Sequence, residues 1–174
     1  FDFVITDESG KTYKDPGTRL EDYYCYDRPV TAPQAGWVVA VEDGVDENRV
    51  GDVNLDRNWG NSIVIRHGEY LFTKISHIKK DTIKVSVGKE VKKGQILAKI
   101  GNSGRSPEPH IHFQVQSTPH IGSKTLKYPV AYFMEKLSTG VKFHAFDYPK
   151  KGQTISNVKV NPLMKKAFEL IPGM

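Results

Sequence analysis

The feature that most constrains the fold is a series of short segments in which apolar and polar residues alternate, each bounded by turn-forming residues. Residues 61–68 and 70–78 are neighbouring segments of this kind, and they predict a β-hairpin. Alternation divides the second segment into two faces, with Tyr70, Phe72, Lys74 and Ser76 on one and Leu71, Thr73, Ile75 and His77 on the other. Further segments run through residues 29–41, 82–101 and 109–115 without a helical period between them. The sequence therefore predicts an all-β fold, an antiparallel β-sandwich core with long loops.

Two polar stretches are predicted to be loops. Residues 7–22 are rich in turn formers, and residues 42–59 combine turn residues with many Asp and Glu side chains. A calcium-binding loop is an alternative for residues 42–59, but the regular EF-hand spacing with its terminal Glu is absent. We therefore expect a solvated loop there.

The pattern changes beyond residue 133. We predict a β domain at residues 1–133 and a short C-terminal extension of mixed structure at residues 134–174, which is alternatively part of a further region. Residues 141–148 alternate like a strand, and Asn161-Pro162 predicts the start of a short helix from Leu163 to Leu170.

The composition excludes several classes of protein. With 38% hydrophobic and 26% charged residues the chain has an ordinary soluble composition, and no apolar run approaches the roughly 18 residues that span a membrane. The lysines are spread along the chain without a basic helix or an aromatic and basic sheet motif, so no nucleic-acid partner is expected. The net charge of +5 favours an anionic environment such as a cell wall. The chain opens without Met, so we expect a processed or trimmed chain in which the missing signal peptide carries no information about localisation.

The cysteine count limits the chemistry of any metal site. Cys25 is the only cysteine, so an internal disulfide and a cysteine-based zinc site are both excluded. A metal would have to be bound by histidine and carboxylate side chains.

Residues 109–115 (PHIHFQV) are the stretch with the most chemical information. His110 and His112 are two residues apart in a predicted strand, so both imidazoles would point to one face, which suits a zinc site or an acid/base site. A strand with one solvated, histidine-containing face is the alternative that this pattern alone leaves open. Asp2 lies in another short apolar segment, where a carboxylate is costly unless it is exposed, paired or bound to metal.

An ordered set of motifs resembles the M23 family of zinc metallopeptidases, the lysostaphin-like peptidoglycan endopeptidases. The similar segments are listed in chain order: Pro29-Val30-Thr31-Ala32, Gly36-Trp37-Val38, Gly60-Asn61-Ser62-Ile63-Val64-Ile65, Ser76-His77-Ile78, Val91-Lys92-Lys93-Gly94-Gln95, Gly101-Asn102-Ser103-Gly104 and Pro109-His110-Ile111-His112-Phe113. The resemblance covers roughly residues 1–133.

The resemblance implies roles for four residues. His112 matches the metal-binding histidine of the HxH motif, His110 matches the histidine that acts on the catalytic water, and His77 matches a second histidine that does not bind metal. Asp2 is similar to the aspartate of an upstream His-x-x-x-Asp motif, whose histidine would fall four residues earlier, before Phe1. The implied cofactor is Zn²⁺, and Asp2 would be a buried carboxylate whose charge the metal satisfies.

The other polar candidates are assigned structural or solvated roles. His67 lies at a hairpin turn, His120 lies in a loop, and His144 lies in the tail strand without a reason to be a ligand. Asn61 and Arg105 are candidates for the wall of a groove, although Asn61 more often fixes a turn and Arg105 is more often solvated.

The resemblance implies an extracytoplasmic zinc endopeptidase that cuts peptide cross-links of peptidoglycan. One alternative is a catalytically inactive M23-like domain that binds cell wall or regulates a partner hydrolase. The segment from Val91 to Gln95 is also similar to biotinyl and lipoyl domains, but the lysine motif that those domains require is absent. No oligomeric state is predicted.

Overall fold

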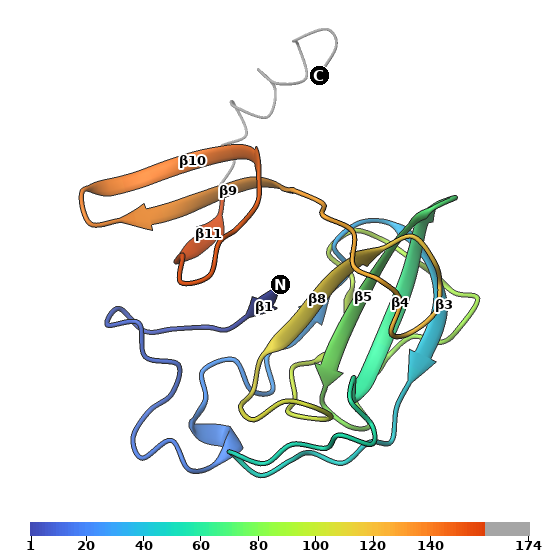
Figure 1. Cartoon of the computed structure of the whole chain (residues 1–174), viewed down its shortest axis with the longest axis horizontal. Coiled ribbons are helices and arrows are strands. Elements are labelled where there is room, and N and C mark those ends of the chain that lie inside the picture. Colours follow the sequence, from blue (N-terminus) through green and yellow to red (C-terminus); the bar gives the residue numbers. More distant parts are fainter. Residues whose placement is uncertain (159–174) are drawn as a thin grey trace, which may run out of the picture. The chain divides into compact units, whose positions relative to one another are not determined.

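Strands with alternating apolar residues build the central sheet of the structure (Figure 1). The computed structural model describes residues 1–158, and the chain divides into two units at Lys127 and Tyr128. In the first unit, six antiparallel strands form one sheet in the order β1 (Asp2–Phe3), β8 (Ile111–Gln116), β5 (Leu71–Ile78), β4 (Asn61–Gly68), β3 (Gly36–Glu42) and β6 (Glu90–Val91). The predicted all-β antiparallel fold and the β4–β5 hairpin are confirmed.

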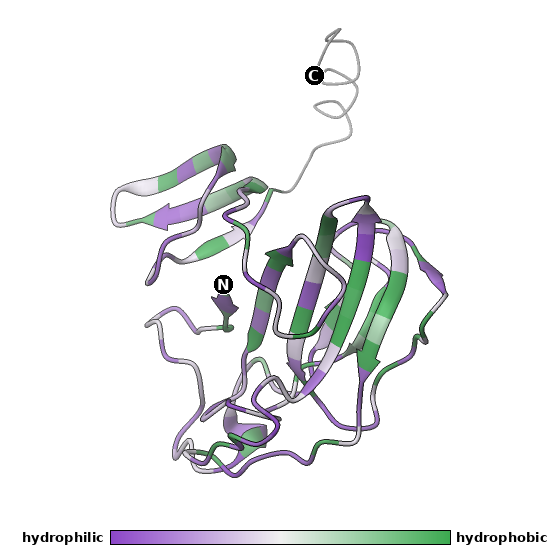
Figure 2. Ribbon diagram, turned by 45° about the vertical axis from the view of Figure 1, so that its right-hand side comes forward, coloured by the Kyte–Doolittle hydropathy of each residue, from purple (hydrophilic) through white to green (hydrophobic). Residues whose placement is uncertain are grey.

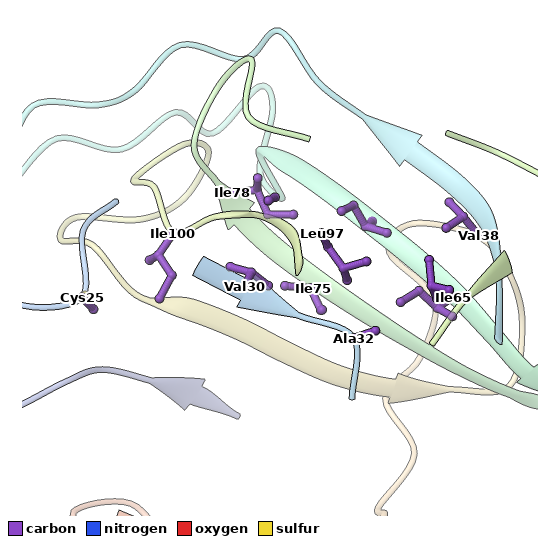
Figure 3. Packing of buried hydrophobic residues seen from close by; sticks show 12 residues of the cluster. Cys25, Val30, Ala32, Val38, Ile65, Ile75, Ile78, Leu97 and Ile100 are labelled. Carbon is purple, nitrogen blue, oxygen red and sulfur yellow. The ribbon is translucent and has the colours of Figure 1, made fainter. Parts of the chain in front are cut away.

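A smaller antiparallel sheet lies against one face of the central sheet. It pairs β2 (Pro29–Thr31) with β7 (Ile96–Lys99), and the only helical element among the described residues is a single 3₁₀ turn, η1 (Leu20–Asp22). Buried apolar side chains from both sheets and the segments beside them form one cluster, which Figure 3 shows from close by: Cys25, Val30, Ala32, Val38, Ile63, Ile65, Ile75, Ile78, Val91, Leu97, Ala98 and Ile100. This cluster is the core of the sandwich, because it removes the apolar face of the central sheet from water.

The other face of the central sheet is polar. Figure 2 shows that hydrophilic and hydrophobic residues follow one another along the strands of the central sheet. Because successive side chains of a strand point to opposite faces, the apolar residues face the core and the polar ones face the other way. The fully buried polar side chains of β4, β5 and β8 include Ser62, Lys74, Ser76 and Gln116. A buried polar surface of this kind needs hydrogen-bond partners, and the candidate site lies on it.

The alternation predicted for β5 fails at its end. His77 was assigned to the face of Ile75, yet its backbone has a φ of 62°, in the left-handed region. The imidazole of His77 instead lies near the imidazoles of His110 and His112, with ring centroids 4.7 and 6.0 Å away. The face assignment of His77 was therefore wrong, because one left-handed residue breaks the period of two.

The loop at residues 42–59 is more ordered than the expected solvated loop. The carboxylate of Glu47 accepts hydrogen bonds from the backbone N–H groups of Lys80 and Asn102, and burial raises the pKa of Glu47. The Asn48 amide donates to the carbonyls of Gly104 and Ser106. These contacts attach the loop to the turn that leads into β8.

The second unit contains a three-stranded antiparallel sheet in the order β10 (Gly140–Asp147), β9 (Val130–Leu137) and β11 (Ile155–Asn157). The strand predicted at residues 141–148 is confirmed by β10. The predicted domain boundary after residue 133 falls inside β9, whereas the two units divide at Lys127 and Tyr128. The helix predicted at residues 163–170 lies outside the described residues.

Two glycines allow the turn before β8 to pack against the turn before β4. Gly104 has a φ of +80°, and a Cβ there would lie 2.3 Å from the backbone nitrogen of Gly60. We expect Gly104→Ala to lower the free energy of unfolding by about 3 kcal/mol or more, since left-handed strain and a backbone clash add together. Gly88→Ala is the matched control, because Gly88 has a φ of +84° with nothing within 4 Å of a Cβ, and about 1 kcal/mol is expected. Urea unfolding measures both, and equal losses would contradict the packing role of Gly104.

Candidate active site

The structure brings together the four residues that the sequence singled out. His112 lies in β8, where its neighbours across the sheet are Ser76 of β5 on one side and Asp2 of β1 on the other. His110 precedes β8, and His77 lies near the end of β5. The three imidazoles and one carboxylate therefore meet on the polar face of the sheet.

The chain enters β8 through a turn that is fixed at both ends. The Cys25 thiol, which is part of the apolar core, donates to the carbonyl of Pro109 at 2.9 Å. The hydroxyl of Ser106 donates to the side-chain oxygen of Asn102 at 2.8 Å. Both contacts hold the turn at residues 101–109 in place, and so they help to position His110, which follows it.

Asp2 and His112 share a short polar contact. The Asp2 Oδ1 lies 2.7 Å from Nδ1 of His112 and 3.8 Å from Nε2 of His110. The hydrogen bond with His112 is the main cause that lowers the pKa of Asp2 to about 2, so the carboxylate is ionised at neutral pH. The expectation that Asp2 is buried is wrong, because its side chain is 64% exposed on a two-residue strand at the sheet edge.

Two glutamines lie on the Nε2 side of His112, opposite Asp2. The Gln114 amide nitrogen donates to the carbonyl of Ser123 and to Oε1 of Gln116, and its own Oε1 lies 3.3 Å from Nε2 of His112 as a potential acceptor. The Gln116 amide nitrogen donates in turn to the carbonyls of Thr118 and His120. Nδ1 of His112 donates to the ionised Asp2 carboxylate, because a carboxylate can only accept. If a metal displaced that proton, Nε2–H could donate to Gln114, and Nδ1 would be the nitrogen that binds the metal.

The other two imidazoles are oriented by backbone carbonyls. Nδ1 of His110 donates to the carbonyl of Glu108 at 2.9 Å, and Nδ1 of His77 donates to the carbonyl of Ser103 at 2.7 Å. In each neutral ring, Nε2 is then left with a lone pair that can accept a proton. Both rings can therefore accept a hydrogen bond through Nε2.

His77 is the least accessible of the three imidazoles. Its side chain is buried, with only 4% of the residue exposed, and burial followed by the neighbouring His110 lowers its pKa to about 3. His77 is therefore neutral throughout the physiological range.

Sequence reasoning missed Trp59, which lies beside His112, and Lys74, which contacts Trp59. The ring centroids of Trp59 and His112 are 5.3 Å apart, and Nζ of Lys74 lies 3.0 Å from the centre of the same indole. The signal for Lys74 was its alternation with Ser76, which placed a lysine on the site's face of β5. No sequence signal indicated Trp59, since its contact is with residues distant in the chain.

The remaining sequence candidates have contacts that fit structural roles. Asn61 is buried and hydrogen-bonds the backbone of Val45 and Ile78, whereas Arg105 is exposed. His67 contacts the carbonyl of Ala35 and the hydroxyl of Thr73. Within residues 1–158, no group of three or more His, Cys, Asp or Glu side chains is arranged to hold a metal.

The comparisons with known proteins identify the family of the chain. The sequence model described as peptidase family M23 matches residues 21–121. The chain belongs to peptidase family M23. The family predicted from the sequence is confirmed, and the matched M23 region includes His77, His110 and His112 but not Asp2.

Two relatives come from Vibrio cholerae. Peptidoglycan DD-endopeptidase ShyA is 37% identical over 95 residues, which are 50% of this chain and 22% of that protein. Peptidoglycan DD-endopeptidase ShyC is 31% identical over 107 residues, which are 61% of this chain and 22% of that protein. This M23 chain therefore spans about a fifth of the length of each relative.

Solved structures of M23 proteins resemble this chain as well. The catalytic domain of the prophage-encoded M23 protein EnpA from Enterococcus faecalis has a TM-score of 0.47 and 23% identity, and the match covers 71% of this chain and 87% of that one.

The buried neutral His77 predicts how stability depends on pH in metal-free protein. Between about pH 3 and the usual histidine pKa near 6.5, the unfolded chain binds a proton at this residue and the folded chain does not. The free energy of unfolding should therefore fall on acidification through this window, by about 1.4 kcal/mol per pH unit from this group. Urea unfolding with a chelator present, for wild type and His77→Gln, measures the contribution. Equal pH slopes for the two proteins would show that His77 is not buried in its neutral form.

Proposed function

We propose that this M23 domain is a zinc-dependent endopeptidase that hydrolyses peptide cross-links of bacterial cell-wall peptidoglycan. The observation that carries the proposal is the 2.7 Å approach of Asp2 Oδ1 to Nδ1 of His112, with two further imidazoles beside it. The names of ShyA and ShyC, both peptidoglycan DD-endopeptidases, support the substrate class.

The donor atoms of Asp2 and His112 fit a zinc ion. A carboxylate oxygen and an imidazole nitrogen are usual zinc ligands, and their convergence on one point is what a shared metal requires. Catalytic zinc sites commonly have three protein ligands, and the M23 motif His-x-x-x-Asp assigns the third to a position before residue 1 of this sequence. Bound zinc would supply a water of lowered pKa and polarise the scissile carbonyl.

Gln114 would support the ligand role of His112. When zinc takes the place of the Nδ1 proton that His112 donates to Asp2, the Gln114 oxygen would accept a hydrogen bond from Nε2–H of His112. Histidine ligands commonly donate their second N–H group in this way, which fixes both the tautomer and the ring orientation.

His110 is the residue best placed to take a proton from the attacking water. Its Nδ1 proton is held by the carbonyl of Glu108, and its free Nε2 lies 3.8 Å from the Asp2 oxygen. After accepting a proton, the same Nε2 becomes a donor that can protonate the leaving amine.

His77 would act as a neutral partner beside His110. The carbonyl of Ser103 holds its Nδ1 proton, and its low pKa keeps the ring uncharged. A neutral ring with a free Nε2 can accept a hydrogen bond from water or from protonated His110, and so it would orient them in the site.

The charge of the chain suits an extracytoplasmic location. A net charge of +5 favours association with anionic cell-wall polymers. Among residues 1–158, no helix is long and apolar enough to cross a membrane.

Alanine variants of the two HxH histidines separate metal binding from catalysis. In the full-length protein, His112→Ala should lose zinc and cleavage together, whereas His110→Ala should retain zinc and lose at least about 100-fold in cleavage rate, the size expected for a proton-transfer residue. Metal analysis and release of soluble peptides from purified peptidoglycan measure the two properties, with His120→Ala as the control. Wild-type protein that binds no zinc and cleaves nothing would instead support the inactive, wall-binding alternative.

Gln114 offers a test of how His112 is oriented. Gln114→Leu should weaken zinc binding by about 10–100-fold, because the Nε2 proton of His112 loses its acceptor. Gln114→Glu keeps an acceptor oxygen and should bind zinc more tightly than Gln114→Leu does. Competition with a zinc-binding dye gives both affinities, and equal values for the two variants would refute this role of Gln114.

A further inference from the structure

We propose that Lys74 is a positioning residue of this M23 site, whose buried ammonium group holds the Trp59 indole against the imidazole of His112. This inference rests on the proposed function, since it assigns a role in metal binding. It concerns a side chain whose ammonium group contacts Trp59, and the proposed role acts through that ring.

Lys74 is an unusual residue to find inside a protein. Its side chain is fully buried, and its Nζ is the one buried side-chain polar atom among the described residues without a hydrogen-bond partner. Burial alone lowers its pKa to about 8, with no contribution from a neighbouring carboxylate. An unpaired buried amine destabilises a fold relative to an apolar side chain of the same size. The stability of the sheet therefore does not explain why a lysine stands here.

The ammonium group contacts the indole of Trp59. Its Nζ lies 3.0 Å from the centre of the indole ring, where the negative face of the ring attracts a cation. This attraction strengthens in a site from which water is excluded. An apolar side chain would fill the same volume without fixing the ring by charge.

The position of Lys74 in the sheet connects it to His112. Lys74 is the neighbour of Gln114 across the β5–β8 ladder, and Ser76, two residues further along β5, is the neighbour of His112. Gln114 contacts the Nε2 edge of the His112 imidazole, while the Trp59 indole packs against the ring at 5.3 Å. The orientation of the His112 ring thus depends on two supports, and Lys74 holds one of them.

The loop at residues 118–123 also restrains the Trp59 indole. A Cβ on Gly122 would lie 3.3 Å from the indole nitrogen of Trp59, so the loop at residues 118–123 passes close to the ring. The same loop supplies the carbonyl of Ser123 that orients Gln114. Freeing Trp59 would therefore loosen both supports of His112.

Lys74→Met tests the role of the charge, because methionine keeps most of the side-chain length and removes the ammonium. In the full-length protein, we expect an unfolding midpoint equal to or above that of the wild type, together with a zinc dissociation constant raised at least tenfold. Lys74→Arg should recover most of the affinity, because a guanidinium group also stacks on aromatic rings. Lys84→Met, which removes an exposed lysine, is the control for the change in net charge.

A fluorescence readout tests the contact without zinc or catalysis. Residues 1–174 contain two tryptophans, so in a protein of these residues Trp37→Phe leaves Trp59 as the only tryptophan, and excitation at about 295 nm avoids the tyrosines. In that background, Lys74→Met should at least double the acrylamide quenching constant of Trp59, and Lys74→Arg should leave it near the parent value.

Each outcome decides between the two proposals. Unchanged quenching, unchanged zinc affinity or a lowered unfolding midpoint in Lys74→Met would each overturn the positioning role, the last because it indicates a merely structural lysine. A parent protein that binds no zinc would overturn the proposed function instead, and the quenching comparison would still show whether Lys74 holds Trp59.

Discussion

The site depends on His112 lying between two antiparallel ladders. Ser76 is its neighbour on one side and Asp2 is its neighbour on the other. Because side chains alternate between faces, a slip of one residue in the β5–β8 register would turn His112 into the apolar core and bring Phe113 to the polar face. The apolar contacts of Ile75 and Phe113 within the core oppose that slip. The same burial that stabilises the sandwich therefore fixes the position of the proposed metal ligand.

The two faces of the central sheet carry different kinds of interaction. One face is an apolar core, where packing is nondirectional. The other face holds polar side chains whose hydrogen bonds have direction: the hydroxyls of Ser62 and Ser76 bond each other at 2.8 Å, and Gln114 and Gln116 are ordered by the carbonyls of a loop. Directional bonds select a single arrangement, which is what a site with defined tautomers needs. Lys74 is the exception on this face, and its charge is the reason to assign it a role.

Much of the site could be predicted because its signals are local. Two histidines two residues apart at the start of a predicted strand share a face, and the apolar residues Ile111, Phe113 and Val115 that alternate along it identify the strand. The ordered motifs brought Asp2 and His77 into the same prediction, although they are distant in sequence from His112. The side of the sheet on which His77 lies could not be predicted, since a left-handed φ at a residue other than glycine has no clear sequence signal.

The residues that sequence reasoning missed depend on tertiary contacts. Lys74 contradicts the rule that lysine stays exposed, so its burial is visible only once Trp59 covers it. Glu47 was expected in a solvated loop, but it accepts backbone hydrogen bonds from two distant turns.

The most direct test of the proposed metal centre is anomalous diffraction at the zinc edge from crystals of the full-length protein. A zinc ion bonded to Asp2 Oδ1 and His112 Nδ1 at about 2.0–2.2 Å is expected, with Nε2 of His110 and His77 outside bonding distance. Zinc bound through Nε2 of His110, or zinc absent from Asp2, would contradict it.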